Sequence, residues 1–130
     1  MALYTSCIYH QNHPGRRISV MSKHTLADGR TPDPRITEQS YDEWLRILAP
    51  PLRLVGDYYQ RGLSWEQFAT HYRAYLQWED VNEKVAELSH RALTGDITLL
   101  CVEEEPEKCH RRLLAQECKR ERPELSVVIK

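Results

Sequence analysis

The sequence has few of the features that mark specialised classes of protein. No stretch approaches the roughly 18 consecutive apolar residues that a membrane helix needs, and the first residues show no basic segment ahead of a long apolar run. The formal net charge of -1 excludes the overall positive field that drives non-specific binding to DNA. The chain also contains no internal repeat and no low-complexity segment. We therefore expect a cytoplasmic protein without a membrane segment, in which a nucleic-acid partner would require a local basic patch.

Cysteine is present at four widely and unequally spaced positions, namely Cys7, Cys101, Cys109 and Cys118. This spacing is not typical of a small secreted domain that is held together by disulfides. We expect reduced thiols, which leaves a reactive cysteine possible. A chain of 130 residues with 41% apolar and 28% charged residues has the size and composition of one globular domain. We predict a single domain over residues 1–130.

The first two thirds of the chain predict two strands, a long loop and several helices. β-branched and aromatic residues indicate strands at 2–9 and 16–22. The loop at 24–37 contains two prolines and a glycine and has a length that is often functional. Capping boxes and helical spacing of apolar residues indicate a helical middle section. The predicted helices are 41–48, 52–59, 65–76 and 81–93, with Ser40 and Ser64 as the N-caps of the first and third and Gly95 after the last.

The last third predicts a strand, a helix and a second strand. An apolar run at 96–104 has the near-continuous hydrophobicity of a central strand that is covered on both faces. Pro106 suits the first position of a helix over 106–121, and 125–129 forms a last strand. Strands joined by such a crossover are parallel. We therefore predict an α/β fold, as a small Rossmann-like three-layer domain with a short, mostly parallel sheet and a helical middle section.

The segment CVEEEPEKCHRRLL, residues 101–114, carries most of the candidate chemistry. Alternation along the strand places Cys101 and Glu103 on the same side of its carboxyl end. Helical spacing places Cys109 and His110 in the first helical turn, facing the sheet. Open α/β sheets bind ligands at this position, and a helix N-terminus favours an anion and lowers the pKa of a nearby thiol. Arg111 would add a bidentate grip on phosphate or carboxylate.

From this placement we assign a role to each candidate. Cys109 is predicted to be a nucleophile or redox thiol, and His110 its acid/base partner. Arg111 is predicted to clamp an anion and Glu103 to act as a base or to orient the imidazole, with Cys101 as a further ligand-binding residue. The function that this predicts is a small enzyme or ligand-binding domain for a phosphate-bearing partner, a nucleotide or nucleic acid. Whether the protein is an enzyme stays open at this point.

Other interpretations of the same residues also stay open. Cys101 in an apolar strand fits a small buried hydrophobe, and Cys101 with Cys109 would fit a thiol redox sensor. A zinc site formed by these two cysteines and His110 matches none of the usual ligand spacings, so we predict neither a metal nor a cofactor. A non-catalytic module for a nucleic acid or protein would use the basic face of the 106–121 helix. That face contains Arg111, Arg112, Lys119, Arg120 and Arg122.

The stretch LLCVEEEPEKCHRRLLA resembles the signature of the uncharacterised domain-of-unknown-function family 488, in which a strand ending in Cys-x-Glu leads through an acidic, proline-containing loop into Cys-His-Arg. The matching residues are Cys101, Glu103, Pro106, Cys109, His110 and Arg111. The helical middle at 41–76 resembles that of a branch of the family. Many members have an Asp-x-Arg element after an N-terminal strand, for which the available counterpart is Asp28-Gly29-Arg30 in a loop. The resemblance implies an α/β, Rossmann-like domain and no established reaction.

Overall fold

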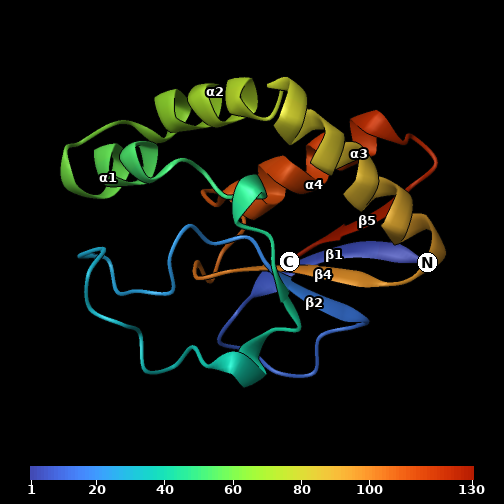
Figure 1. The fold of residues 1–130 in the computed structure, drawn as a ribbon, viewed down its shortest axis with the longest axis horizontal. Helices are drawn as coiled ribbons and strands as arrows, with labels where there is room; N and C mark the ends of the chain where they lie inside the picture. The colour runs from blue at the N-terminus through green and yellow to red at the C-terminus, as the bar shows by residue number, and fades with distance from the viewer.

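A five-stranded parallel sheet lies at the centre of the protein (Figure 1), for which a computed structural model describes all residues from 1 to 130. Its strands are β1 (Ala2–Cys7), β2 (Arg16–Ser19), β3 (Glu43–Trp44), β4 (Ile97–Cys101) and β5 (Ser126–Ile129). Their order in the sheet is β3-β2-β4-β1-β5, and every neighbouring pair is parallel. The predicted parallel sheet is therefore confirmed. As predicted, β4 is the central strand, and all five of its residues are buried.

The α-helices cover one face of this sheet, as Figure 1 shows. They are α1 (Leu52–Gln60), α2 (Trp65–Tyr75), α3 (Glu79–Thr94) and α4 (His110–Glu121), and two short 3-10 helices precede them, η1 (Glu38–Ser40) and η2 (Arg46–Leu48). The main apolar core lies between the helices and the sheet, where strand residues such as Leu99 pack against helix residues such as Tyr72 and Leu114. None of the four helices has the length and hydrophobicity that crossing a membrane would require.

Irregular chain covers the opposite face of the sheet. The hydroxyl of Thr98 donates a hydrogen bond to the Pro14 carbonyl at 2.7 Å. Leu100, two residues further along the same face of β4, packs in a smaller apolar cluster with Ile8 and Met21, from the segments that follow β1 and β2. The predicted three layers are therefore present, and the third layer consists of loops because the chain between β1 and α1 contains no α-helix.

The predictions for the three helices between Pro51 and Gly95 are confirmed. Ser64 is the N-cap of α2, and its side chain accepts the backbone N–H of Gln67 at 3.1 Å, as the capping box requires. Gly95 is the C-cap of α3.

The helix predicted over 41–48 is wrong. Glu43 and Trp44 instead form β3, which pairs with β2 at the edge of the sheet. The indole N–H of Trp44 donates to the Met21 carbonyl at 2.7 Å, which holds the strand in place. The true capping box in this region joins Thr37 to Ser40, at the short helix η1.

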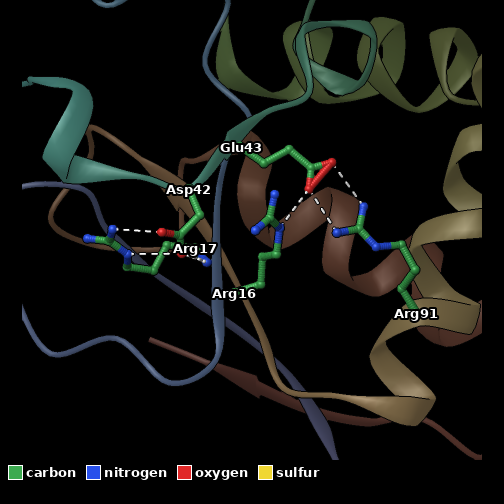
Figure 2. Close-up of polar contacts among 5 residues, drawn as sticks. All are labelled: Arg16, Arg17, Asp42, Glu43 and Arg91. Atoms are coloured by element: carbon green, nitrogen blue, oxygen red, sulfur yellow. Dashed lines mark hydrogen bonds and ion pairs between the residues drawn. The ribbon is translucent and has the colours of Figure 1, made fainter.

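Ion pairs explain why a strand forms here (Figure 2). The Glu43 carboxylate accepts hydrogen bonds from Arg91 on α3 at 2.8 Å and from Arg16 on β2 at 3.2 Å. The preceding residue, Asp42, binds the guanidinium of Arg17 at 2.9 Å. Contacts with distant parts of the chain therefore outweigh the local helical pattern, which is the usual reason that propensity fails.

Candidate functional site

Two thiols and an imidazole meet where β4 ends and α4 begins. Cys101, Cys109 and His110 are 4%, 2% and 8% exposed, respectively. Their ligand atoms, two Sγ atoms and one imidazole nitrogen, all lie within 4.8 Å of one another. We call these three residues the Cys–His cluster. They are the predicted site residues at the carboxyl end of the central strand, and the fold brings them together.

Helix α4 begins later than its predicted start at Pro106. Its first residue is His110, and Cys109 is the N-cap. Arginine side chains bind the carbonyls ahead of the helix: Arg112 donates to Pro106 at 3.2 Å and to Glu107 at 2.7 Å. These contacts hold residues 106–109 as a turn, in which the N–H of Cys109 bonds to the Pro106 carbonyl at 3.2 Å. The helix start predicted at Pro106 is therefore wrong, although the proline does begin the turn.

The imidazole of His110 is held in one orientation. Its Nε2 lies 2.6 Å from the Val20 carbonyl. Because a carbonyl oxygen only accepts hydrogen bonds, Nε2 carries a proton. In the neutral ring Nδ1 is then an acceptor, and it faces the Sγ of Cys101 at 3.6 Å. The backbone that follows β2 therefore fixes the tautomer of this histidine.

The two thiols of the Cys–His cluster differ in their pKa. The pKa of Cys101 is lowered, first by a hydrogen bond from the side chain of Cys109 and then by the charge of Arg111 and by backbone N–H groups. The pKa of Cys109 is raised well above its ordinary value by burial and by the neighbouring sulfur. The sequence-based prediction that the helix N-terminus lowers the pKa of Cys109 is therefore wrong, because burial outweighs the helix dipole. The role of Cys109 as nucleophile stays a prediction.

Arg111 points into the protein and is fully buried. Its guanidinium donates to the carbonyls of Glu103 at 2.5 Å and of Lys130 at 3.0 Å. A third contact reaches the Glu104 carbonyl at 3.3 Å, and a fourth reaches the Sγ of Cys109, also at 3.3 Å. Arg111 thus ties the loop after β4 to the C-terminal residue and places positive charge behind the thiols. Its predicted role as an anion clamp stays a prediction.

Glu103 also lies at the site, but its carboxylate does not contact the imidazole. It accepts a hydrogen bond from the hydroxyl of Tyr59 on α1. Burial, together with this bond, raises the pKa of Tyr59 well above its ordinary value. Glu103 was predicted to orient the imidazole of His110. In the structure the Val20 carbonyl orients that ring instead.

A cavity of about 630 Å³ opens from the Cys–His cluster, a volume typical of small-molecule sites. Its lining contains all three members of the cluster and Glu103, but not Arg111. One wall is aromatic, with Tyr58 and Tyr59 from α1 and Trp65 and Phe68 from α2. The facing wall comes from the long loop after β2 and includes Lys23, Asp28, Arg30 and Arg35.

Some charged groups of this lining bind other parts of the protein, and others have no partner. Asp28 accepts the backbone N–H groups of Arg30 and Thr31, each at 2.9 Å, so its carboxylate orders the loop. Arg30 and Lys108 are exposed and make no ion pair. The cavity therefore offers free cations beside an aromatic wall.

Sequence reasoning missed the aromatic wall and Lys108. The Tyr58-Tyr59 pair read as part of an ordinary amphipathic helix, and only the packing of α1 against α2 places these rings opposite the loop. The length of the 24–37 loop was the one available signal for the facing wall.

A second group of ligand-type side chains, Cys7, His10 and Glu104, lies near the end of β1. His10 and Glu104 are exposed, and the imidazole Nε2 lies 2.9 Å from the Glu104 carboxylate.

Comparisons with known proteins place the chain in a family. A family model described as the active DUF488-N3 subclade matches residues 3–122. Neither a curated protein nor a solved structure matches the chain. Because the match covers most of the sequence, the chain belongs to the DUF488 family, as the Cys-x-Glu and Cys-His-Arg elements indicated.

Proposed function

We propose that this DUF488 protein is a small enzyme or ligand-binding domain whose cavity takes a phosphate-bearing ligand of the nucleotide type. The observation that supports this most is the pairing of unpartnered cations, Arg30 and Lys108, with an aromatic wall in a single cavity. Cations bind phosphate oxygens, and aromatic faces stack on nucleobases. A mononucleotide contains both kinds of group within one small molecule.

The chemistry, in this proposal, takes place at the Cys–His cluster, in the buried part of the cavity lining. Thiols beside an imidazole are a minimum apparatus for nucleophilic or metal-assisted catalysis. The predicted roles of Cys109 as nucleophile and His110 as proton carrier belong to this proposal. The description of the matched family as an active subclade favours catalysis over binding alone.

The alternative of an interaction module on the basic face of α4 has less support. Arg111, which was predicted to belong to that face, is buried. Lys119 donates to the carbonyls of Pro123 and Leu125, both at 2.6 Å, and Arg120 pairs with Glu117 at 3.2 Å. The positive charges of this face are thus engaged within the chain. A redox sensor that joins Cys101 to Cys109 also remains a prediction, which mass spectrometry after mild peroxide treatment would test.

Calorimetric titration with adenosine monophosphate tests the proposal. Adenosine, which lacks the phosphate, is the matched ligand. We expect adenosine to bind at least tenfold more weakly, because a hydrogen bond to a charged group contributes about 1.5–3 kcal/mol, and about 1.4 kcal/mol is tenfold in affinity. Lys108→Gln should weaken binding of the nucleotide and leave that of adenosine unchanged.

Lys84→Gln is the matched control, because Lys84 is an exposed lysine on α3 that does not line the cavity. It should bind both ligands as the unmodified protein does. Equal affinity for nucleotide and nucleoside, or equal losses in the two lysine variants, would refute the proposal.

A further inference from the structure

The Cys–His cluster has the geometry of a metal-binding site. Zinc in proteins is tetrahedral, with Zn–S distances of about 2.3 Å and Zn–N distances of about 2.0 Å. A sulfur and a nitrogen on one such ion therefore lie about 3.5 Å apart. The separation of Cys101 Sγ from His110 Nδ1 is 3.6 Å. The Sγ of Cys109 lies within 4.8 Å of both atoms, so a small side-chain rotation completes a three-atom face.

The histidine already has the protonation pattern that a metal requires. Metal-bound histidines usually donate the N–H of the other ring nitrogen to a carboxylate or a backbone carbonyl. Here Nε2 donates to the Val20 carbonyl, which leaves the lone pair of Nδ1 directed toward the sulfur of Cys101. In the protein without an ion, that buried lone pair has only a thiol, a weak donor, as its partner.

The sulfur atoms also have the outer hydrogen bonds that thiolate ligands accept. The backbone N–H groups of Val102 and Glu103 contribute to the lowered pKa of Cys101. The guanidinium of Arg111 donates to the sulfur of Cys109 at 3.3 Å. Two thiolates buried so close together repel each other, whereas a divalent cation between them balances both charges.

We propose that Cys101, Cys109 and His110 bind one Zn²⁺ ion through two thiolate sulfurs and the imidazole Nδ1. Binding displaces the protons of those thiols that are still protonated, so the metal-bound cluster is neutral. All three ligands belong to the cavity lining, which leaves the fourth position of the ion open to a water molecule or a ligand in the cavity. Three protein ligands with one open position are the arrangement of catalytic rather than structural zinc.

Binding of the metal alone, without any nucleotide, tests this inference. Protein purified and dialysed against zinc should retain one ion per chain by elemental analysis. Substitution with Co²⁺ should produce a thiolate-to-metal charge-transfer band in the near ultraviolet and the visible spectrum of a tetrahedral site. Cys101→Ser and Cys109→Ser should each lower the affinity by more than the roughly 10–100-fold that follows loss of an outer hydrogen-bond partner.

Cys118→Ala is the matched control, because Cys118 is a buried thiol of α4 outside the cluster, and this variant should keep the full metal content. A wild-type protein that shows no charge-transfer band with Co²⁺ overturns the inference, whether or not the serine variants fold. Ions retained by the two serine variants but lost on replacement of Cys7 would place the site elsewhere and would also overturn it. Lys108→Gln should keep its metal, so failure of metal binding and failure of nucleotide binding are separate outcomes.

Discussion

Replacing Arg111 by methionine should lower the free energy of unfolding by about 3 kcal/mol, because loss of hydrogen bonds from a charged donor has effects of about 1.5 kcal/mol each. The guanidinium makes two short bonds, to the carbonyls of Glu103 and Lys130 at 2.5 and 3.0 Å, and two such losses give this figure. The contacts at 3.3 Å add little. Methionine fills a similar volume, so no large cavity opens.

Urea unfolding, followed by circular dichroism at 25 °C, measures this effect. With a slope of about 1.5 kcal/mol per molar urea, a value within the usual range, the midpoint should fall by about 2 M. Arg112→Met is the matched control. Arg112 also donates to two loop carbonyls, but it is only half-buried, so water can replace it. Its loss should stay below about 1 kcal/mol.

A loss below about 1 kcal/mol in the Arg111 variant, at an unchanged slope, would refute the reasoning, since the carbonyls would then have found other partners. Arg111→Lys refines the test. A lysine keeps the charge but cannot reach several carbonyls with fixed planar geometry, so it should restore only part of the stability.

Three further predictions follow from the fold. Ser64→Ala removes the N-cap of α2 and should lower stability by about 1 kcal/mol in urea unfolding; no measurable change would show that the cap is redundant. Leu114→Ala, at a fully buried core position, should lower stability by about 2–5 kcal/mol in the same assay, and a loss below this range would mean that the core closes around the gap. Arg17 lowers the pKa of Asp42 to about 2 from 3.8, so the ion pair stabilises the fold above pH 3.8 and its contribution is lost as the pH falls through 2. Acid unfolding of Asp42→Asn should lack this component, and an unchanged pH profile would contradict it.

The central part of the fold could be predicted because local sequence propensity and contacts between distant residues favour the same structure there. The apolar run of β4 and the helix stop at Gly95 lead to the observed structure without help from the rest of the chain. At 41–48 local propensity and long-range contacts favour different structures. The local pattern is helical, but Arg16 and Arg91, which are far away in sequence, hold Glu43 in a strand. No local pattern contains that information.

The positions of the site residues were predictable for the same reason. Strand alternation and helical spacing bring Cys101 close to Cys109 and His110 at one strand-to-helix junction. The direction in which Arg111 points was not predictable from the spacing, because it depends on carbonyls at Glu103 and Lys130 that only the folded chain places within reach.

The pKa shifts of the two thiols and the tautomer of His110 could be assigned only from the full structure. A helix N-terminus lowers the pKa of a solvent-exposed thiol by a modest amount. On that basis the sequence predicted a lowered pKa for Cys109. In the folded protein, burial and the neighbouring sulfur raise the pKa of Cys109. Hydrogen bonds from Cys109 and from the backbone lower the pKa of Cys101 and favour its thiolate. The Val20 carbonyl, ninety residues away in sequence, then decides which nitrogen of His110 is free. Contacts outside the motif therefore set the chemistry of all three residues, and measured metal content distinguishes Cys109 as a metal ligand from Cys109 as a nucleophile.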